Sequence, residues 1–240
     1  MLCFYLCLEK SIYPIFICNI TIIFSMNLPS NKDYLINKLL LLFLVNNTRE
    51  KSHNYLGMTK LQKFIFLAEK NLHENGIKAL TYDFFMWNLG PLSKEIYVDY
   101  KMLTHSKILN QNANITLSKK GRYILSDFQE IFEDNKDILK IIEDIIDAFA
   151  QYDTECIVQY VQNLTLFMEG CGEPRKIMDL EKGMDLITGL SHQDSSLSFV
   201  IDDSWLETLD ILLDKELCES IDRSEQDIKD GKVIHLRGVL

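Results

Sequence analysis

Histidine and cysteine are the side chains of this sequence best suited to nucleophilic, acid-base or metal-binding chemistry at neutral pH. No C-x-x-C pair occurs and no histidine lies at ligand spacing from a cysteine, so neither a zinc site nor a disulfide framework is indicated. The motifs G-x-x-x-x-G-K-[ST], G-x-G-x-x-G, G-x-S-x-G and H-E-x-x-H do not occur either. We therefore expect a protein that is not an enzyme, with no catalytic residue, metal or cofactor. The scattered thiols fit a reducing cytoplasm, the expected location. These residues are His53, His73, His105, His192 and His235, and Cys3, Cys7, Cys18, Cys156, Cys171 and Cys218.

A group of cations could instead bind phosphate. Residues 51–122 hold 11 Lys and Arg against 5 Asp and Glu, although the whole chain has a formal net charge of −10. Such a group would give weak, salt-sensitive binding to a nucleic acid backbone, and only Arg122 could make a bidentate contact with guanine. An ordinary solvated surface is the alternative. The candidate DNA-binding residues are Lys60, Lys63, Lys94, Lys101, Lys119, Lys120 and Arg122.

The C-terminal part of the chain has the opposite charge. Residues 201–240 hold 11 Asp and Glu against 5 Lys and Arg, and they begin with an amphipathic helical pattern that carries Trp205, Leu209, Leu212, Leu213 and Leu217 along one stripe. An acidic amphipathic helix followed by the short apolar run at 233–234 could bind a basic partner. Packing against the chain's own domain is an equally good interpretation of the same pattern.

The remaining pattern predicts a mainly α protein with a small β component. Helices are expected over 33–46, 59–75, from Ser93 to Leu103, from Lys119, and through the acidic stretch 127–168. Thr59 and Gln62 have the spacing of a capping box. The stretch 81–88 suits a short strand or a buried helix end, and short strands around an Asn-rich turn at 110–114 would complete a winged-helix-like arrangement.

The composition divides the chain into four parts. Residues 1–25 are an apolar extension that Glu9-Lys10 interrupts, which leaves runs too short to span a bilayer. Three interpretations of this extension remain open. Translation could begin at Met26, so that the residues before it are an annotation artefact. Otherwise the extension is a strand or helix that packs in the core, or a membrane anchor. A helical domain is expected over 26–187, a linker over 188–203, and an acidic segment over 204–240.

Four stretches together resemble the Panacea domain, which many antitoxins carry, including SocA-like antitoxins. They are YLINKLLLLFLV, MTKLQKFIFLAEKNL, YDFFMWNLGPLSKEIY and ITLSKKGRYIL, and the likeness covers residues 33–130. Its most specific marks are T-K-L-Q-K and the aromatic-then-G-P-x-S-x-E-I-Y signature. Leu89 stands where the family more often has tyrosine before Gly-Pro. The motif residues expected to have a structural role are Thr59, Gln62, Trp87, Gly90, Pro91 and Ser93.

The ending SEQDIKDGKVIHL is similar to the D-I-x-x-G-x-V tails of Phd-type and RelB-type antitoxins, in which the tail neutralises the toxin. The two resemblances imply a cytoplasmic antitoxin of a type II toxin–antitoxin system, with a protein toxin as its partner and its own promoter DNA as a second partner. An oligomer is compatible with this hypothesis, and no membrane partner is expected. The alternatives are a winged-helix-like transcriptional regulator and a protease adaptor. The expected toxin-binding residues are Trp205, Leu209, Leu212, Leu213, Asp227, Ile228, Gly231, Val233 and Ile234.

Overall fold

The central helix of the protein, α2 (Asn31–Lys51), is buried on all sides along its middle turns. The computed structural model describes residues 30–52, 54–167, 173–188 and 195–232. The leucine-rich run between Leu35 and Val45 has almost no polar face, and such a helix is stable only inside a protein. Ser30 caps its first turn, because its side chain accepts a hydrogen bond from the Asp33 amide while Asp33 bonds back to the Ser30 amide.

The second core helix, α3 (Met58–Glu74), packs against α7 (Lys136–Phe149) and α8 (Thr154–Asn163). Its apolar residues from Leu61 to Leu72 are buried, as the helical spacing predicted. The capping-box prediction for Thr59 and Gln62 is wrong. The N-cap is Gly57, and no side chain caps the helix. Gln62 bonds instead to the backbone of Ser93, the residue just before the helix that begins at Lys94.

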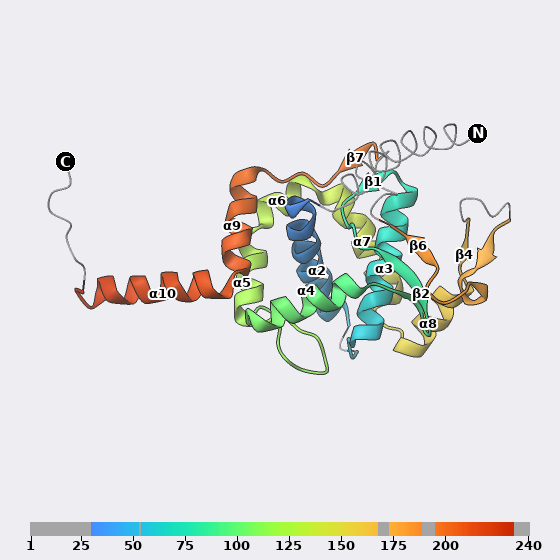
Figure 1. Ribbon diagram of the computed structural model, residues 1–240, viewed down its shortest axis with the longest axis horizontal. Coiled ribbons are helices and arrows are strands. Elements are labelled where there is room, and N and C mark those ends of the chain that lie inside the picture. Colours follow the sequence, from blue (N-terminus) through green and yellow to red (C-terminus); the bar gives the residue numbers. More distant parts are fainter. Residues whose placement is uncertain (1–29, 53, 168–172, 189–194, 233–240) are drawn as a thin grey trace, which may run out of the picture.

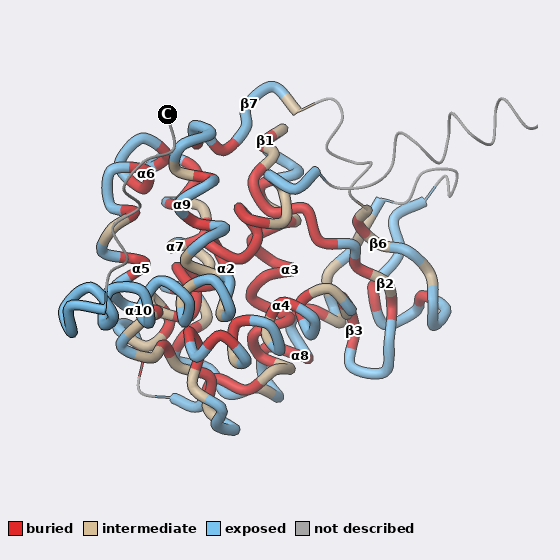
Figure 2. Tube along the Cα trace, turned by 60° about the vertical axis from the view of Figure 1, so that its left-hand side comes forward, coloured by how far each residue is buried: buried red, intermediate tan, exposed pale blue. Residues whose placement is uncertain are grey.

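Shorter helices surround these two in Figure 1, and the burial colours of Figure 2 place α2 and α3 at the centre. The predicted mainly α fold with a small β component is confirmed. The surrounding helices are α4 (Lys94–His105), α5 (Lys119–Asp127), α6 (Gln129–Asp134), α7, α8 and α9 (Asp203–Leu213), and α10 (Lys215–Lys229) extends from them.

Among the described residues the strands are short and form three small sheets. β2 (Phe84–Trp87) lies between β3 (Gly90–Leu92) and β6 (Asp185–Ile187), and both pairings are antiparallel. Trp87 pairs with Gly90 at the turn, where Gly90 has a φ of +87° that favours glycine. The other pairs are β1 (Ile77–Lys78) with β7 (Leu197–Ser198), in parallel, and β4 (Thr165–Leu166) with β5 (Arg175–Lys176), followed by a 3₁₀ turn at Ile177–Asp179.

The strand pair expected around the Asn-rich turn is reduced to a single bridge between Leu109 and Leu117. Asn110 closes this loop, because its side-chain amide donates to the Thr116 hydroxyl and to the Leu117 carbonyl. Ser118 caps the following helix, as predicted, by accepting from the Gly121 amide. The loop therefore positions α5 without forming the two-stranded wing of a winged helix.

The described part of the expected linker, residue 188 and residues 195–203, belongs to the folded body, and residues 189–194 lie outside the described residues. Of residues 188–203, β7 pairs with β1, and Phe199 and Ile201 are buried in the core. The Asn135 side chain holds this segment through two hydrogen bonds to one residue: it donates to the Val200 carbonyl and accepts from the Val200 amide. The expected boundary at 203/204 is therefore wrong, since the chain stays packed on the body through α9. Residues 1–25 lie outside the described part of the chain.

Candidate protein-interaction site

Helix α9 carries the apolar residues that were expected to contact a toxin, but they face the protein's own interior. Leu209 is fully buried, and Leu206 is nearly so. The Trp205 ring packs against Phe128 with 5.0 Å between the ring centroids. Leu212 and Leu213 are half-buried against the same core. The assignment of Trp205, Leu209, Leu212 and Leu213 as toxin anchors is therefore wrong, because these side chains hold α9 to the body.

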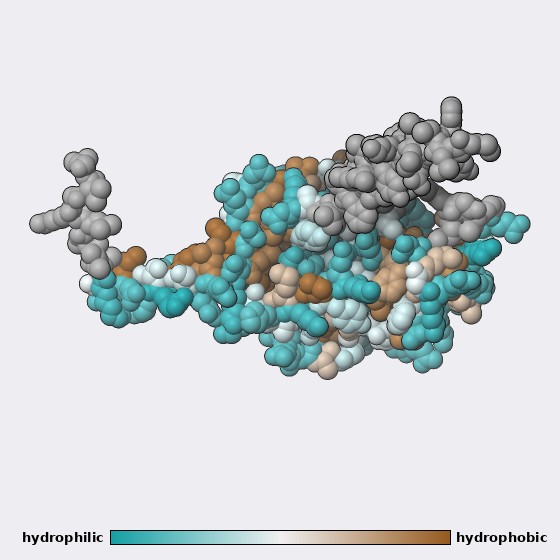
Figure 3. All heavy atoms as spheres, viewed as in Figure 1, coloured by the Kyte–Doolittle hydropathy of each residue, from teal (hydrophilic) through white to brown (hydrophobic). Residues whose placement is uncertain are grey.

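Helix α10 is the opposite case, because none of its residues is buried. It leaves the body beyond Asp214 and extends into solvent (Figure 1). Leu217, Ile221 and Ile228 lie on one face at spacings of four and seven residues, and they are 43%, 42% and 61% exposed. Figure 3 shows hydrophobic residues along one edge of this projecting helix. Large aliphatic side chains on one face of an otherwise polar helix are typical of a surface that binds another protein.

The direction of α10 is fixed where it begins. The Asp214 carboxylate accepts from the Leu217 amide at 2.9 Å, which caps the helix. The Ser106 hydroxyl, at the end of α4, donates to the Leu213 carbonyl at 2.8 Å. The Cys218 thiol donates to the Ile211 carbonyl, and the Lys120 ammonium lies 3.4 Å from the same sulfur. The Ser106 and Lys120 contacts attach the junction of α9 and α10 to the body, and the other two bonds hold the first turn of α10 on the end of α9.

The charges of α10 flank its apolar face. The helix has five carboxylates against three cations, and helical geometry places Glu225 and Asp227 on either side of the line from Ile221 to Ile228. Glu225 pairs with Lys229 at 3.8 Å and Asp227 with Lys232 at 3.6 Å, on side chains that are mostly exposed. Such surface pairs contribute about 0–1 kcal/mol and exchange easily for a partner's cations.

The end of the tail is described only in part. Gly231 follows α10 with a φ of +72°, a conformation that stops the helix and favours glycine. Asp227 and Ile228 are exposed, as a contact with a partner requires. Val233 and Ile234 lie outside the described residues.

Two of the seven candidate DNA-binding cations are buried, so their assignment is wrong. The Lys60 ammonium donates to the carbonyls of Ala150 and Tyr152 at 2.9 and 2.6 Å, where α7 ends. The Lys63 ammonium donates to the Pro91 carbonyl at 2.6 Å, and burial lowers its pKa to about 8. Neither can reach a phosphate.

The other five cations occupy two different helices. Lys94 and Lys101 are on α4, and Lys119, Lys120 and Arg122 are on α5. The Arg122 guanidinium donates to the Leu117 carbonyl. DNA binding by these five residues stays a prediction.

The motif residues that carry the family resemblance do come together, in a polar clasp between α3 and the start of α4. The Gln62 side chain donates to the Ser93 carbonyl at 2.8 Å and accepts from the Ser93 amide at 2.9 Å. The next residue of α3 is Lys63, and its ammonium group donates a hydrogen bond to the Pro91 carbonyl. Four motif positions, Trp87, Gly90, Pro91 and Ser93, therefore define the turn that these two side chains hold. Thr59 is half-buried in the first turn of α3.

A buried charge network was missed by the sequence patterns. Lys38, in the leucine-rich run of α2, lies 3.2 Å from a carboxylate oxygen of Asp99 on α4. The Tyr82 hydroxyl donates to the other oxygen at 2.8 Å. Burial raises the pKa of Asp99 and Lys38 opposes that rise. Burial also raises the pKa of Glu69 well above its usual range, while the Tyr82 amide donates to it. Lys38, Asp99 and Tyr82 satisfy one another's polar groups, which indicates a structural role.

The described residues offer no group of three His, Cys, Asp or Glu side chains placed to hold a metal ion. Nor does any helix among them have the length and apolar content needed to cross a membrane. Comparison of the chain with models of known protein families, with curated proteins and with solved structures gives no match.

Proposed function

We propose that this protein is an antitoxin that neutralises a protein toxin by direct contact, and that α10 with the residues after it is the contact element. The observation that carries the proposal is the exposed stripe of Leu217, Ile221 and Ile228 on a helix with no buried residue. The resemblance of residues 33–130 to the Panacea domain and of the tail to antitoxin endings supports the same function.

The geometry of α10 specifies the kind of surface that it would bind. Its aliphatic stripe fits an apolar groove about one helix wide, and Glu225 and Asp227 would meet cations on the rims. The rest of the protein is the scaffold in this proposal, because α9 is fastened to the core and holds the first turn of α10. Charge attraction between an acidic helix and a basic groove would mainly speed their encounter.

Insertion of charge into the stripe tests this proposal. We expect Ile221→Asp/Ile228→Asp to abolish protection in cells that co-express the cognate toxin, for which the product of the adjacent open reading frame is the candidate to be tried, because two carboxylates would be forced into an apolar groove. Gln226→Asp on the opposite face of the same helix is the matched control and should protect like the unaltered protein. Growth after induction is the readout. If the double variant protects as well as the control, α10 is not the neutralising element.

A further inference from the structure

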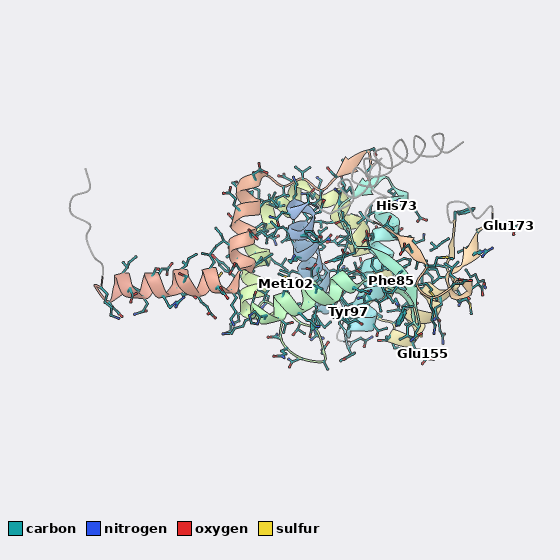
Figure 4. The ribbon with its side chains drawn as sticks, viewed as in Figure 1. His73, Phe85, Tyr97, Met102, Glu155 and Glu173 are labelled. Carbon is teal, nitrogen blue, oxygen red and sulfur yellow. The ribbon has the colours of Figure 1, made fainter. Side chains whose placement is uncertain are left out.

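A groove between α2 and α4 combines apolar walls with acidic groups. Its volume is about 390 Å³, and α4 contributes Glu95, Val98, Asp99 and Met102 to its lining. The last three follow Glu95 by three, four and seven positions, so all four share one face of the helix. Tyr34 of α2 lines the same groove. Val98 and Met102, the latter labelled in Figure 4, are more than half exposed, so the apolar part of the groove is open to solvent.

One of the two carboxylates in this groove already has a counter-charge. Asp99 lies 3.2 Å from the Lys38 ammonium and accepts a hydrogen bond from the Tyr82 hydroxyl. The Lys38 ammonium also donates to the Tyr34 carbonyl at 3.2 Å. Both charged side chains are almost completely buried. The Lys38–Asp99 pair therefore gives the groove satisfied polar groups and no net charge.

The second carboxylate, that of Glu95, has no such partner. It accepts a hydrogen bond from the Asp83 amide at 3.0 Å, and no cation among the described residues pairs with it. Burial raises the pKa of Glu95, the Asp83 amide opposes that rise, and the Asp83 and Asp99 carboxylates add to it. A half-buried carboxylate without a counter-charge is costly, so a cation placed beside Glu95 would be stabilising.

The other lysines of α4 do not supply this cation. Lys94, the residue before Glu95, lies over the Phe85 ring, with 5.4 Å from its ammonium to the ring centroid. Lys101 lies six residues after Glu95 and so on a different face of the helix. A cation for Glu95 would therefore come from another molecule.

The groove as a whole is acidic. Burial raises the pKa of Tyr34, and the carboxylates around its ring raise it further. Lys38 and Lys78 neutralise two of these carboxylates through ion pairs of 3.2 and 2.9 Å. The negative charge of Glu95 remains, and it favours a positively charged ligand. The carboxylates that act on Tyr34 are Glu95, Asp83, Asp99 and Asp33.

We propose that this groove binds an arginine side chain of a partner protein, with the guanidinium beside the Glu95 carboxylate and the methylene stem on Val98 and Met102. Arginine suits the site better than lysine, because its guanidinium is more weakly hydrated and can donate two parallel hydrogen bonds to one carboxylate. Its stem covers apolar surface while its charged end stays at the polar group. This contact is separate from the proposed role of α10, since α2 and α4 supply all of its lining residues.

Two capped tripeptides, each added to the full chain, test the proposal. One carries arginine between two glycines, and the other carries citrulline, which has nearly the same shape and no charge. Two-dimensional ¹H–¹⁵N NMR measures binding through the shifts of the amide signals. We expect the arginine peptide to bind with a dissociation constant in the millimolar range and to shift amides of α2 and α4. It should bind at least about fivefold more tightly than the citrulline peptide.

Two variants and a matched control locate the contact. Glu95→Gln removes the charge and keeps an oxygen that can accept from the Asp83 amide, so this variant should fold normally and bind the arginine peptide at least about fivefold more weakly. Val98→Ser/Met102→Ser, at two exposed positions, should weaken binding at least about threefold, because the stem loses apolar contact. The control is Glu155→Gln at an exposed carboxylate of α8, labelled in Figure 4, and its affinity should stay within about twofold of the unaltered protein.

Equal binding of the arginine and citrulline peptides would overturn the proposal. Equal binding of the arginine peptide by Glu95→Gln and by the unaltered protein would do the same. Shifts confined to amides outside α2 and α4, or shifts that do not saturate, also contradict it. None of these results bears on the protection measured with Ile221→Asp/Ile228→Asp, so the groove and the neutralising role of α10 are tested separately.

Discussion

Leu209→Ala is expected to lower the free energy of unfolding by about 2–5 kcal/mol, because the side chain is fully buried and its removal leaves a cavity in the core. The matched substitution Leu217→Ala, eight residues further along, should change it by less than about 0.5 kcal/mol, since Leu217 is exposed on α10. Urea unfolding followed by circular dichroism measures both.

This pair of leucines distinguishes the two helices directly. Equal losses at both positions would mean that α10 is packed like α9, and the exposed stripe would then not exist in solution. A negligible loss at Leu209 would mean that α9 is not part of the core.

Asp99→Ala is expected to cost about 3–5 kcal/mol of unfolding free energy, because it leaves the Lys38 ammonium buried without its counter-charge. The Tyr82 hydroxyl loses its acceptor at the same time. The double replacement Lys38→Met/Asp99→Leu should recover most of this loss, since a buried ion pair usually contributes little more than apolar residues of similar volume.

The double variant is the control for this second prediction. If it is as unstable as Asp99→Ala, the cost comes from packing at these positions rather than from an unpaired charge. A loss below about 1 kcal/mol in the single variant would show that water reaches the Lys38 ammonium and replaces the carboxylate.

The helices could be predicted from the sequence because their signals are local. The leucine-rich run of α2, the spacing of apolar residues in α3 and the Ser118 cap of α5 each lie within a few neighbouring residues. The clasp could not be predicted in the same way. Gln62 has the spacing of a capping residue, but its actual partner, Ser93, lies 31 residues away in the chain.

Burial in the candidate site also depends on residues far away in the sequence, so it could not be predicted from local patterns. Trp205, Leu209, Leu217 and Ile221 all belong to amphipathic patterns, and the patterns alone do not say which face is covered. The difference comes from distant partners, such as Phe128 beneath Trp205. Lys60 is a similar case: its acceptor carbonyls lie 90 and 92 residues along the chain, so its burial has no local signal.

The measurement that tests the central claim most directly is protection from the product of the adjacent open reading frame, the candidate toxin, by a chain that ends at Asp214. This truncation removes α10 and leaves α9, with its buried Leu209, in place. We expect the truncated protein to unfold cooperatively at nearly the same temperature as the full chain and to give no protection. A truncated protein that folds and still protects would contradict the claim that α10 and the residues after it are the neutralising element.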